Sequence, residues 1–299
     1  MGAGHGHGHA GARHRWRLAV AFGLVGSFFL VELVAGLVSG SLALLSDAGH
    51  MAADVVALGA ALAATKIATR RDDTGRRTYG SYRAEVFASG FTVLLMLGVA
   101  AYVVVEAVRR VGEVVEVSSG PMLVVGALGL LVNVVCLALL RGGSKESINV
   151  RGAYLEVVAD TAGSVGVLVA GALVALTGST SADTLVALAI GGFVAVRAIV
   201  LGREVLAVLG QHAPHDVDLA AVVRDLEQVP GVAQVHDLHA WTLTSGMNVA
   251  TAHLVLRVGG DSQVVLGAAR VTLREGHGID HATLQVEVTP ARECHEATW

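Results

Sequence analysis

The sequence predicts an α-helical membrane protein with a small α+β domain at its C-terminal end. Hydrophobic residues make up 54% of the chain and charged residues only 15%, with a mean hydropathy of +0.64, whereas soluble domains are about 25% charged. Long apolar runs fill the first two thirds of the chain, and mixed, alternating segments begin near residue 212. The formal net charge of -4 offers no basic surface for nucleic acid. We therefore expect a lipid bilayer, and no nucleic acid, as the surroundings of this chain.

Six apolar runs each approach the ~20 residues that a helix needs to cross a bilayer. They cover residues 18–38, 42–66, 84–106, 121–140, 152–176 and 183–203. Six crossings would place both termini on one side of the membrane. Arginine and lysine gather near the N-terminus and in the segments 66–83 and 141–151, so the positive-inside rule predicts cytoplasmic termini. The expected six-helix domain spans residues 17–206 and lies in the cell membrane.

The first 16 residues form a tail in which histidine alternates with glycine and alanine, at positions His5, His7, His9 and His14. Such a segment cannot bury a hydrophobic core, so we expect it to be disordered. Its function could be to collect metal ions, or it could be a dispensable extension.

Residues 212–290 show the pattern of a compact α+β domain. An amphipathic helix ends before Pro230 and Gly231, and two alternating segments, 233–246 and 247–260, predict strands joined by a Ser-Gly turn. A helix over 261–276 and a third strand over 282–288 follow. Helix, strand, strand, helix, strand predicts helices on one face of a sheet. Residues 291–299 are a short tail.

Two pairs of polar residues stand out within the apolar runs: His50 with Asp54, and Glu156 with Asp160. Residues four positions apart lie on the same face of a helix, so each pair aims two metal-ligating groups in one direction. Ionisable groups in a membrane helix are costly and usually mark an ion pathway. The two pairs together predict one metal site inside the bilayer.

Four stretches of sequence resemble the cation diffusion facilitator family, in particular its bacterial zinc-exporting branch: SGSLALLSDAGHMAADVVAL, YGSYRAEVFASG, SINVRGAYLEVVADTAGSVGVL and VHDLHAWTLTSG. The resemblance runs from about residue 16 to residue 290. It implies a homodimer with six membrane helices per protomer and a cytoplasmic ferredoxin-like domain. It also implies export of a divalent metal in exchange for protons, with His50, Asp54, Glu156 and Asp160 as the transport site. Zinc is the first candidate, and manganese, cobalt, iron and cadmium are alternatives.

Glu156 departs from the zinc-exporting branch, which commonly has a histidine at this position. One imidazole and three carboxylates carry three negative charges, so a divalent cation would leave one uncompensated charge, which is costly to bury. One acid could stay protonated, a nearby donor could compensate, or the site could be partly hydrated. Oxygen-rich sites also favour harder ions such as Mn²⁺, although zinc accepts carboxylates.

A second candidate site lies in the C-terminal domain. His236 and His253 fall on the two predicted strands and Glu287 on the third, and side chains on adjacent strands approach closely when they share a face. The resemblance implies that these positions match a cytoplasmic metal site in some relatives, with Gln285 in place of a histidine ligand. Solvated strand histidines are the alternative. Further candidate ligands are His239, His277, His281, Cys294 and His295.

Two other function classes stay open at the level of sequence. A membrane metal sensor would bind without transporting, and an intramembrane metal-dependent hydrolase would use the metal to activate water. The chain has no HExxH pattern, which favours a transporter over an enzyme. No organic cofactor is expected.

Overall fold

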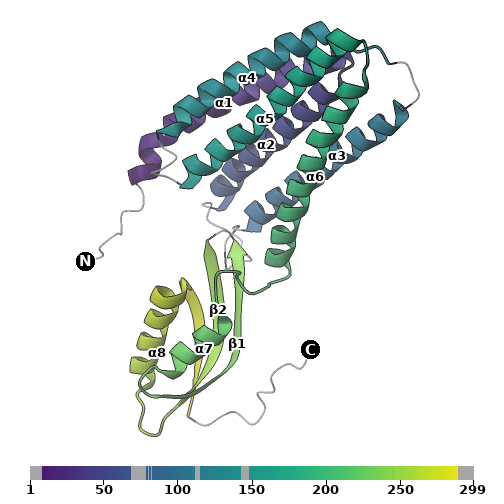
Figure 1. The fold of residues 1–299 in the computed structure, drawn as a ribbon. Helices are drawn as coiled ribbons and strands as arrows, with labels where there is room; N and C mark the ends of the chain where they lie inside the picture. Colours follow the sequence, from purple (N-terminus) through teal and green to yellow (C-terminus); the bar gives the residue numbers. More distant parts are fainter. Residues whose placement is uncertain are drawn as a thin grey trace. The chain divides into compact units, whose positions relative to one another are not determined.

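The computed structural model describes residues 9–68, 79, 81, 83–111, 115–142, 148–244 and 246–288. The chain forms two compact units, one built from residues 1–60 and 90–201 and the other from residues 61–89 and 202–299. Within these residues, six long helices come first along the chain, followed by a small sheet with two short helices (Figure 1).

The six apolar runs all form helices, with bounds close to the expected ones. They are α1 (His9–Ser39), α2 (Leu42–Ala68), α3 (Arg83–Arg109), α4 (Ser119–Arg141), α5 (Ile148–Thr177) and α6 (Ser181–Leu209). α1 begins inside the segment 1–16 that we expected to be disordered, so the helix continues further toward the N-terminus than predicted. Residues 1–8, including His5 and His7, lie outside the described residues.

Five helices are long and apolar enough to cross a membrane within the described residues. The candidate spans are Ala19–Ser39, Arg83–Arg109, Ser119–Arg141, Tyr154–Thr177 and Ser181–Leu209. The expected sixth span forms α2, which has 27 residues but is not among these candidates in the described part of the chain. The fold is thus a membrane-spanning helical domain in which five of the six expected crossings are identified.

Small residues allow the membrane helices to approach closely. α4 packs against both α1 and α5, and these helices also run side by side in Figure 1. Gly49 of α2 faces Val99 of α3, where an added Cβ would lie 2.5 Å from Val99 Cγ1. Gly191 of α6 faces Val103 of α3 in the same way, at 3.1 Å. Side chains larger than hydrogen at these glycines would push the helices apart.

The N-terminus of α2 is fixed by a buried carboxylate from α6. Asp183 accepts hydrogen bonds from the backbone N–H groups of Leu42 at 2.8 Å and Ala43 at 3.1 Å, and from Ser41 Oγ at 2.6 Å. Arg110 Nη1 donates to Gly40 O at 3.0 Å and lies 3.5 Å from Asp183 Oδ2. These bonds satisfy backbone groups that a helix start leaves open. They set the position of α2 relative to α6.

The C-terminal domain has the order of elements that the sequence predicted. α7 (Leu219–Glu227) precedes β1 (Val232–Thr244) and β2 (Met247–Leu256), and α8 (Ser262–Val271) with the π-helical turn η1 (Thr272–Gly276) precedes β3 (His281–Glu287). The sheet order is β1-β2-β3, with β1 and β2 antiparallel and β2 and β3 parallel. Asp218 and Asp261 accept hydrogen bonds from the first backbone N–H groups of α7 and α8, which stabilises both helix starts.

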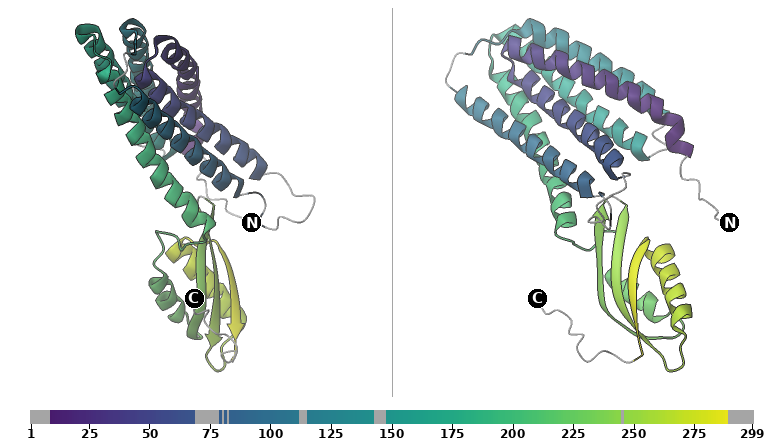
Figure 2. Two further views of the ribbon diagram at one scale, coloured as in Figure 1. Left: turned by 90° about the vertical axis from the view of Figure 1, so that its right-hand side faces the viewer. Right: turned by 180° about the vertical axis from the view of Figure 1, so that it is seen from behind.

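Both short helices cover one face of this sheet, as Figure 2 shows from two sides. Leu226 of α7 and Val265 of α8 belong to one hydrophobic core that also includes Ala252 and Leu254 of β2 and, partly buried, Leu284 of β3. Because side chains alternate along a strand, His253 and Gln285 point to the opposite face. The fold therefore separates an apolar face under the helices from a histidine-bearing face.

Candidate metal sites

Three of the four predicted intramembrane ligands converge. His50 Nε2 lies 3.3 Å from Asp160 Oδ1 and 3.7 Å from Asp54 Oδ2. One ligand atom from each of the three residues lies within 4.8 Å of the other two. His50 and Asp54 lie one turn apart on α2, and Asp160 is on α5, so the i, i+4 spacing works as the sequence predicted. One imidazole nitrogen and two carboxylate oxygens thus lie close enough together to bind one divalent cation.

His50 and Asp160 of this cluster are buried, and Asp54 is partly exposed. The side chains of His50 and Asp160 are only 3% and 7% exposed, and that of Asp54 is 29% exposed. Among the described residues, His50 Nδ1 is a buried atom without a hydrogen-bond partner, whereas Asp160 Oδ1 faces His50 Nε2 at 3.3 Å. Buried polar atoms without partners are rare in proteins.

Glu156 is not brought into this cluster. Its carboxylate Oε1 lies 2.8 Å from Nη2 of Arg197 on α6, and its side chain is 45% exposed, the most exposed of the four predicted ligands. Arg197 also reaches the cluster itself, with Nη2 4.0 Å from Asp54 Oδ1 and Nη1 3.4 Å from His50 Nε2. The fourth predicted ligand is thus paired with a cation that the protein supplies.

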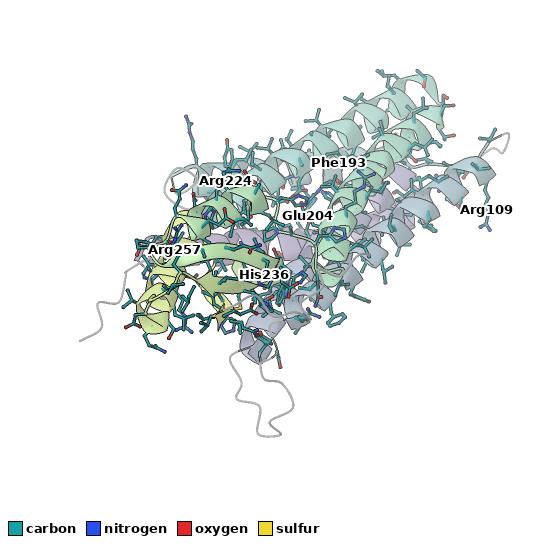
Figure 3. All side chains as sticks on the ribbon, turned by 90° about the horizontal axis from the view of Figure 1, so that it is seen from below. Arg109, Phe193, Glu204, Arg224, His236 and Arg257 are labelled. Carbon is teal, nitrogen blue, oxygen red and sulfur yellow. The ribbon has the colours of Figure 1, made fainter. Side chains whose placement is uncertain are left out.

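A third i, i+4 pair, Phe193 and Arg197 on α6, completes the surroundings of the site. The guanidinium carbon of Arg197 lies 5.9 Å from the centre of the Phe193 ring, within range of a cation–π contact. The same ring meets His50 edge to face, with centroids 6.1 Å apart. Phe193, labelled in Figure 3, thereby contacts both the imidazole and the guanidinium.

Arg197 was not among the predicted site residues. Its signal was present, because a lone arginine in the apolar run GGFVAVRAIVLG is an intramembrane charge and needs a partner. Phe193, four residues earlier, is not a metal ligand, so the spacing of the two residues does not indicate a site. Only the packing of α6 against α2 and α5 shows which residues Arg197 contacts.

Other polar residues of the bundle are buried beside the cluster. Asp47 is 3% exposed and faces Gly163 of α5, while Glu32 of α1 is 1% exposed. Asn133 Nδ2 donates to Ser164 Oγ at 3.1 Å, which joins α4 to α5. Asn133 therefore has a structural role in helix packing.

The C-terminal domain also brings its predicted ligands together. His236 pairs with His253 across β1 and β2, and the two rings meet edge to face at 5.1 Å. Glu287 Oε2 lies 3.2 Å from His236 Nε2, and Glu287 Oε1 lies 3.1 Å from His253 Nδ1. Gln285 Nε2 donates to Glu287 Oε1 at 2.9 Å. The ligand atoms of the two histidines and Glu287 lie within 4.8 Å of one another.

An irregularity in β1 adds a carboxylate that the sequence analysis did not single out. The pairing of β1 with β2 shifts between His236 and His239, as in a β-bulge, and Asp237 has a positive φ of 50°. Asp237 Oδ2 consequently lies 3.7 Å from His253 Nε2, and Oδ1 lies 3.0 Å from His239 Nε2. Strained residues of this kind concentrate at functional sites.

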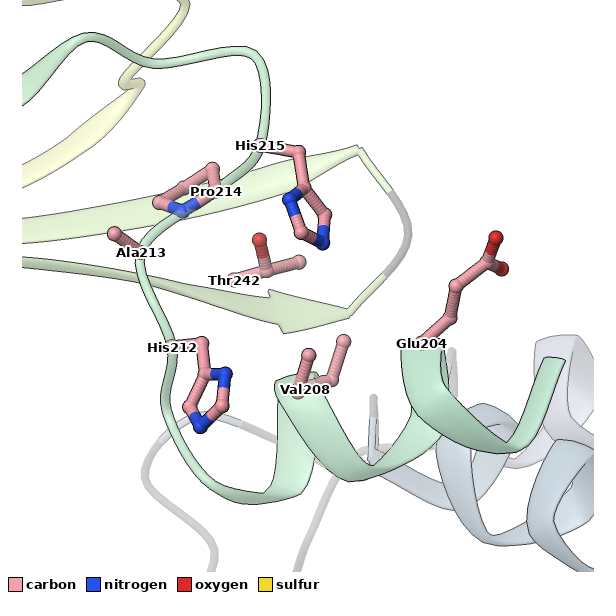
Figure 4. Close-up of a pocket in the computed structure, with 8 residues that line it drawn as sticks. Glu204, Val208, His212, Ala213, Pro214, His215 and Thr242 are labelled. Atoms are coloured by element: carbon pink, nitrogen blue, oxygen red, sulfur yellow. The ribbon is translucent and has the colours of Figure 1, made fainter. Parts of the chain in front are cut away.

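The remaining candidate ligands are separate from this cluster. His277 Nε2 lies 2.9 Å from Asp225 Oδ2 and ties η1 to α7, and the ring of His281 meets Tyr79 at 5.5 Å. Cys294 and His295 lie outside the described residues. His212 and His215 line a pocket with Glu204 and Thr242 (Figure 4), but they form no converging ligand group within the described part of the chain.

A bundle of apolar helices around a buried imidazole and carboxylates defines a membrane protein that handles a metal cation. Two family models match the chain: the cation efflux transmembrane domain over residues 18–209, and the cytoplasmic domain of cation efflux proteins over residues 214–289. The chain belongs to the cation diffusion facilitator family, and it is a multi-pass metal cation efflux transporter with a C-terminal cytoplasmic domain.

Relatives match over nearly their full length. The metal cation efflux system protein CzcD of Cupriavidus metallidurans is 42% identical over 99% of this chain and 94% of its own. The zinc transporter ZitB of Escherichia coli is 35% identical over 93% and 90%. The cadmium, cobalt and zinc/H(+)-K(+) antiporter of Bacillus velezensis is 32% identical over 99% and 95%.

One solved structure, the metal-bound C-terminal domain of the CzcD transporter from Cupriavidus metallidurans, is 38% identical to this chain. It covers 24% of this chain and 100% of its own, with a TM-score of 0.23.

Proposed function

We propose that this transporter exports zinc from the cytoplasm in exchange for protons, through a site that includes His50, Asp54 and Asp160. The observation that carries the proposal is the convergence of these three side chains inside the apolar bundle, with ligand atoms within 4.8 Å of one another. An ionisable cluster in this position has no evident packing role, and it marks an ion pathway.

Proton coupling follows from the ligand chemistry. An imidazole must be neutral, and a carboxylate ionised, before either binds a metal ion, so metal and protons compete for the same atoms. A site that opens to the outside at higher proton concentration would release metal as His50 and one acid take up protons. The relative named as an H(+)-K(+) antiporter supports this coupling.

The donor set supports zinc without restricting the site to it. Zinc accepts imidazole nitrogen and carboxylate oxygen with tetrahedral geometry, and three ligands leave a fourth position for water or another group. The names of the relatives include zinc, cadmium and cobalt. Manganese and iron are the alternatives that oxygen ligands would favour.

The remaining parts of the proposal concern assembly and topology. The protein works as a homodimer with both termini in the cytoplasm, and α2 forms the sixth crossing of a membrane domain over residues 17–206. The cytoplasmic domain covers residues 212–290, with the tail 291–299 after it. His236, His253 and Glu287 bind a second metal ion, which Asp237 supports from the bulge in β1.

Transport can be tested with the purified full-length protein in proteoliposomes. Zinc uptake should increase when a pH gradient is imposed in the direction that drives protons out as zinc enters. A rate of zinc uptake that does not depend on the pH gradient would contradict proton exchange. His50→Ala should abolish uptake, and Ser27→Ala, which removes a hydroxyl that bonds only within α1 at 2.6 Å, should leave it unchanged.

Counterflow distinguishes the transporter from the other two function classes. Vesicles loaded with unlabelled zinc should accumulate labelled zinc through the native chain. A metal sensor or an intramembrane hydrolase would bind zinc without counterflow, so binding in the absence of exchange would favour those alternatives.

A further inference from the structure

We propose that Arg197 is a built-in counter-cation that pairs with Glu156, so that the metal meets His50, Asp54 and Asp160 as ligands in a site with two net negative charges. This inference rests on the proposed transport site and concerns how the charge of that site is set. Arg197 is a positioning and specificity-determining residue in this scheme. It does not bind the metal.

The geometry assigns Arg197 to Glu156 first. The 2.8 Å distance between Arg197 Nη2 and Glu156 Oε1 is that of a charge-assisted hydrogen bond. The other two approaches of the guanidinium, 3.4 Å to His50 Nε2 and 4.0 Å to Asp54 Oδ1, are longer. Arg197 therefore holds the acid that stands apart from the cluster, and it lies at the edge of the other three side chains.

The charges of the four predicted ligands and of Arg197 then balance. With a neutral His50, the three carboxylates and the guanidinium leave two negative charges, which one divalent cation cancels. Without Arg197 the occupied site would keep one excess negative charge in a surrounding of low polarity, where an uncompensated charge is costly. The excess charge that Glu156 introduces into the ligand set is thus compensated by a donor that lies beside it.

The same pair has a consequence for selectivity. Glu156 in contact with Arg197 is withheld from the metal, so the site offers one nitrogen and two carboxylates in place of one nitrogen and three. The fewer carboxylates a site offers, the less it favours hard ions such as Mn²⁺ over zinc. Phe193 helps to keep the guanidinium in place, because its ring contacts both Arg197 and His50.

Four variants of the full-length protein test the proposal by zinc titration and by zinc and manganese transport in proteoliposomes. Glu156→Gln removes the acid that pairs with Arg197, so the guanidinium charge beside Asp54 repels the metal ion. The zinc affinity should therefore fall by about tenfold or more. Arg197→Gln removes a repelling charge and frees Glu156, so zinc affinity should stay or increase and manganese should gain relative to zinc. Arg197→Lys keeps the positive charge but loses the planar guanidinium over Phe193, so its zinc affinity should lie closer to the native value than that of Glu156→Gln, and the reverse order would contradict the proposal.

The double variant Glu156→Gln/Arg197→Gln is decisive. It removes both members of the pair, so the net charge of the site does not change and its zinc affinity should return to within about threefold of the native value. Because neither charge is left without its partner in the bundle, this variant should also fold. Its cobalt-loaded form should have the absorption spectrum of the native protein, since Glu156 is not a ligand. A double variant as weak as Glu156→Gln, or with a changed cobalt spectrum, would overturn the proposal.

Two further readouts keep the possible failures apart. If the ion pair served only to join α5 to α6, both single variants should melt at a lower temperature in metal-free buffer, and their zinc affinities should change in the same direction. That result would also overturn the proposal. His50→Ala reports separately on the transport site. If it leaves zinc binding and transport intact, the proposed function fails whatever the Arg197 variants do.

Discussion

The imidazole Nε2 of His50 on α2 lies 3.3 Å from the carboxylate Oδ1 of Asp160 on α5, although 110 positions separate the two residues in the chain. This contact joins the two helices that carry the predicted i, i+4 ligand pairs. Because both side chains are nearly completely buried, the contact lies inside the bundle. A cation that binds between them is shielded from solvent.

Asp160→Asn should reduce zinc transport by more than about 100-fold, because it removes the charge of a ligand at the centre of the cluster and even supporting residues of metal sites contribute 10- to 100-fold. The measurement is initial zinc uptake in proteoliposomes at equal protein content. Ser27→Ala is the matched control for insertion and folding. Transport by Asp160→Asn at more than a tenth of the native rate would contradict the assignment of this ligand.

Asp183→Ala should destabilise the membrane domain by about 3 kcal/mol. The substitution leaves Arg110 with Glu106 as its acidic partner at 3.2 Å, and it removes the acceptor of the buried N–H groups of Leu42 and Ala43. The melting temperature of the detergent-solubilised protein reports the effect. The control is Thr184→Ala, which removes a 3.5 Å hydrogen bond to Thr180 O at the start of α6 and should change the melting temperature little. Equal melting temperatures for the two variants would refute the role of Asp183.

Gly49→Ala should lower stability by about 1 to 3 kcal/mol, because the added Cβ would lie 2.5 Å from Val99 Cγ1 and overpack the contact of α2 with α3. Gly98→Ala is the matched control, because an added Cβ there meets nothing within 4 Å among the described residues and alanine favours the helix by about 1 kcal/mol. Thermal unfolding of both variants checks the difference. The double variant Gly49→Ala/Val99→Ala should regain part of the loss, and an unchanged double variant would mean that another contact is responsible.

His253→Ala should remove zinc binding by the cytoplasmic domain. The test uses the full-length protein with His50→Ala, so that calorimetry reports only sites outside the membrane cluster. Zinc affinity should fall by more than about 100-fold, because His253 contacts both Glu287 and Asp237. His215→Ala is the control, since its exposed ring lies outside the cluster. Equal zinc heats in the two variants would rule out a metal site at His253.

Much of the fold was accessible from the sequence because its signals are local. An apolar run long enough to cross a bilayer forms a helix in any arrangement, and all six expected runs did so. Alternation and turn residues likewise placed β1 within one or two residues at each end and the start of β2 at the right residue, while β2 ends four residues earlier than predicted. The start of α1 was wrong because alternating glycine and histidine carry little periodic signal, while the helix continues from the apolar run that follows.

The candidate sites divide in the same way. The spacing of His50 to Asp54 depends only on helix geometry and was readable in the sequence. The separation of Glu156 from the other ligands was not, because it depends on Arg197, which comes from another helix. Asp237 was missed for a similar reason, since only a bulge in β1 turns its side chain toward His253.

The sequence by itself determined the helices, the order of the C-terminal elements and the residue types that can bind a metal, because periodicity and composition act within one segment. The tertiary structure decided which of these residues meet and what charge they share. Electrostatic interaction depends on distance between side chains from different helices, and the position of Arg197 beside Glu156 is set by the packing of α6 against α5.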